Sequence, residues 1–99
     1  MTAELKSELM RGLADCLKPA LEVRKVVVFG SFLTSDSPND MDVAVYQDSE
    51  EGYLPLALRY RRMARPVSGH IPLDIIPVRN DASGKFMAEI DRGVVVYER

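Results

Sequence analysis

Residues 26–31 read Val-Val-Val-Phe-Gly-Ser, and this stretch decides the fold. Consecutive β-branched and aromatic residues favour extended chain, and a short run that is apolar at every position predicts a central strand buried on both faces. Gly30 permits the sharp turn that ends such a strand and lets a ligand approach the backbone. Ser31 adds a hydroxyl and a backbone N–H at the start of a short helical turn, where an anion can bind. The stretch therefore predicts a buried strand that ends in an anion site.

A pair of aspartates opens the next predicted strand, which covers residues 41–46. Asp40 and Asp42 are two positions apart, so in extended chain their side chains point to one face, with Cα atoms about 6.5–7 Å apart. Asp74 lies inside a third apolar strand, predicted over residues 71–78. If that strand is a neighbour, about 4.8 Å away, the three carboxylates converge.

Three converging carboxylates predict a metal site. Like charges about 5 Å apart repel by roughly 3 kcal/mol at an effective dielectric constant of about 20, so either one carboxylate binds a proton or divalent cations fill the gap. Mg²⁺ takes oxygen ligands and pairs carboxylates with substrate phosphates, and three carboxylates suit two ions about 3.5–4 Å apart. Because only eight residues separate Ser31 from Asp40, the anion site and the acidic strand together favour a nucleoside triphosphate. The alternative for Asp74 is a structural ion pair with Arg79 or Arg92.

The rest of the chain predicts a small two-layer α/β fold. A helix over residues 3–17 has leucine at every fourth position, a second helix covers residues 53–65, and a third covers residues 83–91. A last short strand covers residues 94–97, which gives the order α-β-β-α-β-α-β. The loop at residues 34–40 is too short for a helical crossover, so we expect a mixed β-sheet with helices mainly on one face.

Individual residues set the ends and faces of these elements. Thr2 is a candidate N-cap of the first helix, and Pro66 is expected to stop the second helix. Pro72 and Pro77 suit the ends of a strand or a strand at the edge of the sheet. The residues of the second and third helices that are expected to point inward are Tyr53, Leu56, Ala57, Tyr60, Met63, Ala64, Phe86 and Ile90.

The composition limits the classes of function. With 99 residues, 13 Lys and Arg and 15 Asp and Glu, the chain is expected to form one domain over residues 1–99, and its net charge of −2 disfavours direct binding of nucleic acid. Its longest apolar run is far shorter than the about 20 residues of a membrane helix. One Cys and one His exclude an intrachain disulfide and most zinc sites. Without a leader segment at the start, these features predict a cytoplasmic protein.

The Gly30-Ser31 pair, the motif Asp40-Met41-Asp42 and the later Asp74 together resemble the signature of the DNA polymerase β-like nucleotidyltransferase superfamily. The chain is most similar to the minimal nucleotidyltransferase domains of that superfamily, and the resemblance covers residues 25–98. It implies a nucleotidyltransferase-type fold in which Asp40, Asp42 and Asp74 are the catalytic and metal-binding residues, with two Mg²⁺ ions expected when nucleotide is bound. It also implies that Gly30 and Ser31 hold the β- and γ-phosphates.

The same resemblance implies a reaction and a partner. The reaction is transfer of a nucleoside monophosphate, AMP from ATP, with pyrophosphate as leaving group. The partner is a small helical RNase of the HEPN family, to which the transferase adds AMP within a toxin–antitoxin pair. The loop from Ser31 to Asp40 is shorter than is common in the family, and Phe32-Leu33-Thr34 stand where a basic residue often follows. These departures favour the alternative of a binding antitoxin with weak or no catalysis; a nucleotide sensor is a third possibility.

Two further surfaces are candidates for a partner. Arg59, Arg61, Arg62 and Arg65 form a basic run on the second predicted helix. It is either a solvated face, with the side-chain stems covering apolar neighbours, or a contact for RNA or an acidic partner. The leucine-striped first helix is the other candidate, and the sequence leaves the oligomeric state open, a homo-oligomer included.

Overall fold

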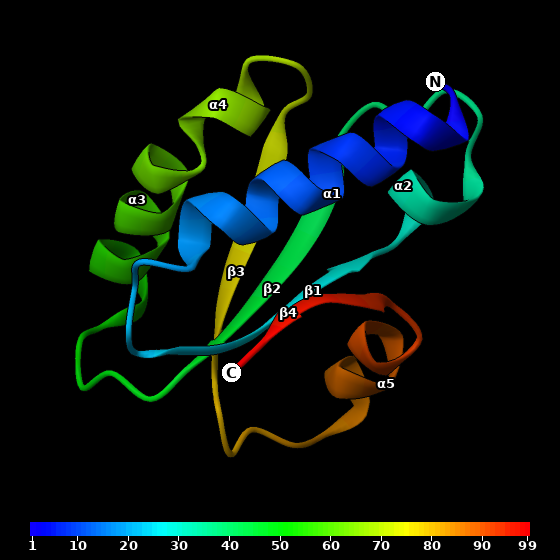
Figure 1. Cartoon of the computed structure of the whole chain (residues 1–99). Coiled ribbons are helices and arrows are strands. Elements are labelled where there is room, and N and C mark those ends of the chain that lie inside the picture. The colour runs from blue at the N-terminus through cyan, green and yellow to red at the C-terminus, as the bar shows by residue number, and fades with distance from the viewer.

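The computed structural model describes residues 1–99 with the exception of the Phe86 side chain, so the expected inward position of Phe86 lies outside the described part. The elements, labelled as in Figure 1, are α1 (Ala3–Leu17), β1 (Val23–Phe29), α2 (Ser31–Thr34), β2 (Met41–Gln47), α3 (Tyr53–Met63), α4 (Arg65–Ser68), β3 (Leu73–Arg79), α5 (Lys85–Asp91) and β4 (Val94–Glu98). The predicted order holds for the longer elements. α2 is the short helical turn expected to begin at Ser31, and α4 is a short helix added to the predicted order. Within the described residues, no helix combines the length and the hydropathy needed to cross a membrane.

The four strands form one sheet in the order β3-β2-β1-β4. β1 pairs antiparallel with β2 and with β4, whereas β2 and β3 are parallel. The parallel pair needs a crossover, and α3 and α4 supply it. The predicted mixed sheet is therefore confirmed, and β3, which contains Pro77, lies at an edge as expected.

The central strand β1 is buried on both faces, as its composition predicts. Val26 and Val28 belong to the larger of two apolar clusters, which also contains the buried side chains of α1, α3 and α4. Val27 and Phe29 point to the other face, into a smaller cluster to which only α5 contributes among the described helices. Figure 1 shows α1 and α3 on one side of the sheet and α5 on the other. The expectation of helices mainly on one face is confirmed, and the opposite face is left largely open.

Local signals set the ends of α1. The Thr2 side chain accepts a hydrogen bond from the backbone N–H of Leu5 at 3.0 Å, as an N-cap does. Leu9, Leu13 and Leu17 are buried against the sheet, so these three leucines form core and are not available to a partner.

The second predicted helix is divided in two. α3 ends at Met63, and Pro66 does not stop helical structure but lies in the first turn of α4. Proline is tolerated there because its missing N–H would have no intrahelical partner anyway. Tyr53, expected to point inward, is 58% exposed at the open end of α3, so that expectation was wrong.

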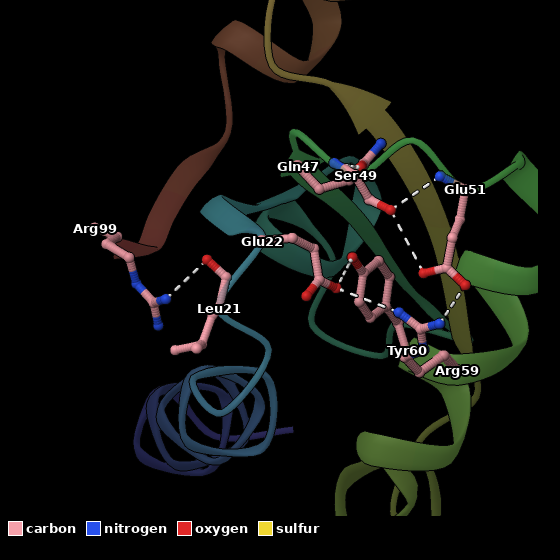
Figure 2. Close-up of polar contacts among 8 residues, drawn as sticks. All are labelled: Leu21, Glu22, Gln47, Ser49, Glu51, Arg59, Tyr60 and Arg99. Carbon is pink, nitrogen blue, oxygen red and sulfur yellow. Dashed lines mark hydrogen bonds and ion pairs between the residues drawn. The ribbon is translucent and has the colours of Figure 1, made fainter.

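A network of polar contacts fixes α3 to the sheet (Figure 2). The hydroxyl of the buried Tyr60 donates to Oε2 of Glu22 at 2.7 Å, and the Arg59 guanidinium pairs with Glu22 at 3.7 Å and also with Glu51. Burial, together with the bond to Glu22, raises the pKa of Tyr60, so the phenol stays protonated and keeps its role as donor. Arg59 is thus neutralised within the chain, and the basic run is reduced by one charge.

Gly93 brings the turn between α5 and β4 against the end of β1. A Cβ atom on Gly93 would lie 2.5 Å from the carbonyl oxygen of Val28 and 2.9 Å from Cβ of Phe29. Only a residue without a side chain allows this approach. The close contact holds α5 beside the carboxyl end of β1.

Candidate functional site

The carboxyl end of β1 and the amino ends of β2 and β3 meet at one end of the sheet. The antiparallel register places Asp42 opposite Phe29, and the parallel register places Asp42 opposite Asp74. Asp40 precedes β2 by one residue, and Gly30 follows β1 directly. The adjacency of the two aspartate-bearing strands, expected from the sequence, is confirmed by this register.

The aspartates of the two strands face the side of the sheet that carries α5. Along β2, Met41 and Val43 point into the larger cluster, whereas Ala44 and Tyr46 point into the smaller one. Because side chains alternate along a strand, Asp42 shares the face of Ala44. Asp74 shares that face with Ile76 for the same reason. The carboxylates therefore lie on the open face, where a substrate has access.

The electrostatics of this end of the sheet are unbalanced. The pKa of Asp42 is raised above its usual value, first by partial burial of the carboxylate. The nearby negative charges of Asp40, Asp74 and Glu89 raise it further. Among the described side chains, no ion pair involves Asp40, Asp42 or Asp74. Arg79, one of the two alternative partners of Asp74, pairs with Asp81 at 3.7 Å instead. The cluster thus carries negative charge that the described chain does not neutralise.

Neither the backbone conformation at Gly30 nor the space around its Cα atom accommodates a residue with a side chain. Its φ of 79° and ψ of −156° lie in a region that is essentially restricted to glycine. A Cβ atom there would lie 2.5 Å from Oδ2 of Asp42. The turn after β1 can therefore lie directly against the Asp42 carboxylate. Ser31 follows at the first position of α2 and is exposed.

Glu89 of α5 and Arg92, the C-cap of α5, also lie at this end of the sheet. Glu89 was not predicted there, and Arg92 was considered only as an ion-pair partner of Asp74. Glu89 is close enough to raise the pKa of Asp42. Glu89 and Arg92 line a cavity of about 240 Å³ together with Gly30, Leu33 and Thr34. The only sequence signal for them is their spacing of three residues, which places both on one side of a helix that ends just before Gly93.

The donor set consists of carboxylate oxygens, which suit a hard cation such as Mg²⁺ better than Zn²⁺. In the described part of the chain, no group of three His, Cys, Asp or Glu side chains is already gathered as metal ligands. Asp42 and Asp74 lie opposite each other on neighbouring strands, but their side chains are not arranged around a common point. A bound cation would have to draw the three aspartate side chains together.

Most of the chain matches a known protein family. A family model described as Polymerase beta, Nucleotidyltransferase matches residues 12–99. The matched segment contains the Gly30-Ser31 turn, all three aspartates and the cavity residues Glu89 and Arg92. No curated protein sequence matches the chain.

Proposed function

Since the chain belongs to the polymerase beta nucleotidyltransferase family, we propose that it is a Mg²⁺-dependent enzyme that transfers AMP from ATP to a partner protein. The observation that carries this proposal is the position of the Asp42 carboxylate between the Gly30 turn and Asp74 on an open sheet face. Phosphoryl chemistry depends mainly on positioning the substrate and stabilising its charge. A glycine turn that lies directly against a carboxylate, beside further carboxylates without ion-pair partners in the described part of the chain, is suited to both tasks.

The reaction is assigned to the residues as follows. Asp40 and Asp42 would hold Mg²⁺, which when bound neutralises the negative charge of the phosphate oxygens. The acceptor hydroxyl oxygen attacks the α-phosphorus of ATP, and its proton passes to the Asp74 carboxylate. As the new P–O bond forms, the bond from the α-phosphorus to the oxygen bridging to the β-phosphate breaks, and pyrophosphate leaves.

The phosphates of ATP are assigned to the Gly30 turn and to Arg92. The chain has no basic residue shortly after Ser31, so the charge of the β- and γ-phosphates needs another cationic partner. Arg92 reaches the same cavity from the opposite element and supplies a guanidinium, which binds phosphate oxygens in pairs. Arg92 therefore replaces the missing basic residue.

We expect Arg92→Ala to weaken ATP binding by about ten- to hundredfold, the range for losing a hydrogen bond to a charged group. Isothermal titration with a non-hydrolysable ATP analogue and Mg²⁺ measures this affinity. Arg79→Ala is the matched control, since Arg79 is exposed at the far end of β3 and pairs only with Asp81 in the described part. Equal affinities for Arg92→Ala and wild type contradict the role given to Arg92.

The acceptor is proposed to be a small helical HEPN-type RNase, in a cytoplasmic toxin–antitoxin pair. The test incubates the protein, Mg²⁺ and ATP labelled at the α-phosphate with the product of an adjacent gene of that type. We expect release of pyrophosphate and a mass increase of one adenylyl group on the partner. Omission of Mg²⁺ or replacement of ATP by AMP serves as control.

The short loop from Ser31 to Asp40 favours one other function, a binding antitoxin that neutralises its partner by occlusion. The variant with both Asp40→Asn and Asp42→Asn separates the two. If this variant still neutralises the partner fully and the wild type adds no label, the transferase proposal is wrong and occlusion is correct.

A further inference from the structure

The outward face of α3 is basic and apolar at the same time. From Gly52 to Pro72 the sequence contains four arginines and no aspartate or glutamate, although the whole chain has a net charge of −2. Arg61, Arg62 and Arg65 are exposed, and in the described part of the chain no ion pair includes them. Arg61 and Arg62 lie on α3 and Arg65 begins α4, so three positive charges are concentrated on two adjoining helices of an otherwise acidic molecule.

Apolar side chains lie on the same outward face. Leu54 is 65% exposed and Leu58 is 47% exposed. Their spacing of four residues places them in one row along α3, on the side opposite the buried Leu56 and Tyr60. Protein interfaces commonly have an apolar centre surrounded by a polar rim. The two leucines correspond to such a centre and the neighbouring arginines to its rim.

This face is held rigidly before any partner binds. The Tyr60 hydroxyl donates to Glu22 and the Arg59 guanidinium pairs with the same carboxylate, which ties α3 to the start of β1 (Figure 2). Arg59 also pairs with Glu51 in the turn just before α3. A helix fixed in this way loses little conformational entropy on binding. The face also lies on the helical side of the sheet, opposite the open side that carries the aspartates.

We propose that the outward face of α3 is a docking surface for an acidic amphipathic helix of a partner protein. The leucine row packs against apolar side chains of that helix, as i and i+4 ridges do, and the three free arginines pair with its carboxylates. Exposed leucines favour a protein over RNA, because an aliphatic side chain offers a base neither stacking nor hydrogen bonds. This proposal is independent of the transferase chemistry.

The test is a titration of ¹⁵N-labelled protein by NMR with a synthetic helical peptide of leucine and glutamate in amphipathic order. We expect shift changes on α3 and α4 and weaker binding at high salt. The same peptide with lysine in place of glutamate is expected not to bind. Shift changes centred elsewhere, no change with millimolar peptide, or equal binding of the lysine peptide overturns the proposal.

Variants and other ligands complete the test. Leu58→Asp and Arg62→Glu are each expected to weaken peptide binding at least tenfold, without changing the thermal unfolding midpoint, because both side chains are exposed. Leu21→Asp and Arg11→Glu are the matched controls at exposed positions outside this face, and they are expected to bind as wild type does. If an oligouridine RNA or vesicles of phosphatidylcholine and phosphatidylserine bind α3 more tightly than the acidic peptide, the proposed occupant is wrong.

Discussion

Asp42→Asn is expected to lower nucleotidyl transfer by about two to three orders of magnitude, the usual loss when one group that stabilises transition-state charge is removed. The amide keeps the shape of the side chain but cannot supply the negative charge that a Mg²⁺ ligand provides. Initial rates of pyrophosphate release at saturating ATP measure the effect. Titration of Mg²⁺ in the presence of an ATP analogue shows separately whether cation binding is weakened.

The same substitution is expected to raise the thermal unfolding midpoint in the absence of Mg²⁺, or to leave it unchanged. Burial and the carboxylates of Asp40, Asp74 and Glu89 raise the pKa of Asp42, so its ionised form is less favourable in the folded chain than in the unfolded one. A carboxyl group whose pKa is raised on folding contributes fully to the stability of the folded chain below the ordinary Asp pKa of about 3.9. This contribution is lost as the pH rises through the pKa that the group has in the folded chain. The stability advantage of Asp42→Asn is therefore greatest above the folded-state pKa of Asp42 and disappears in acid.

Asp48→Asn is the matched control, because it makes the same chemical change just beyond the opposite end of β2. Asp48 pairs with Arg24 at 2.6 Å on the surface, and such pairs contribute about 0–1 kcal/mol. We expect wild-type activity and slightly lower stability. Activity of Asp42→Asn within a few-fold of wild type, or a midpoint that falls by several degrees, would show that Asp42 is a structural and not a catalytic residue.

Sequence reasoning was most accurate where local signals decide the structure. The start and the buried face of α1 follow from the Thr2 cap and the leucine spacing, which lie next to the helix or within it. β1 was expected only from Val26, yet it begins at Val23. Among the additional residues, Lys25 is extended because it pairs with Tyr46 of β2 and Glu98 of β4, not because of its own propensity. Arg24 lies at a register irregularity between Val23 and Lys25.

The prediction of the site depended on the order of the strands, which the sequence does not determine. The motif around Asp42 is local, but its position beside Asp74 depends on the parallel register of β2 and β3. Glu89 and Arg92 could not be assigned to the site, because their position depends on the contact of Gly93 with β1. That contact joins segments more than 60 residues apart in the chain, and no sequence pattern reports it.

Gly30→Ala is expected to impair both the fold and the site. Backbone strain of the kind that Gly30 avoids costs about 1–3 kcal/mol, and each kcal/mol lowers the unfolding midpoint of a domain this size by about 4–8 °C. The new Cβ atom would also lie 2.5 Å from Oδ2 of Asp42, so the carboxylate must rotate away. We expect a lower midpoint in calorimetry and weaker Mg²⁺-dependent ATP binding at a temperature where the variant is still folded.

Two controls separate the backbone effect from the clash with the carboxylate. Gly12→Ala makes the same change within α1, where the new Cβ atom meets Val67 at an ordinary 3.5 Å, and it is expected to stabilise the helix by up to about 1 kcal/mol. In the Asp42→Ala background, Gly30→Ala meets no carboxylate and only the backbone strain is left. Gly30→Ala lowers the free energy of unfolding by one amount in the wild type and by another in the Asp42→Ala variant. The difference between these two amounts is the coupling energy, expected at about 0.5–3 kcal/mol for residues in contact. A coupling energy of zero would mean that the Gly30 turn does not position Asp42. The glycine at the end of β1 would then be required by the backbone conformation alone.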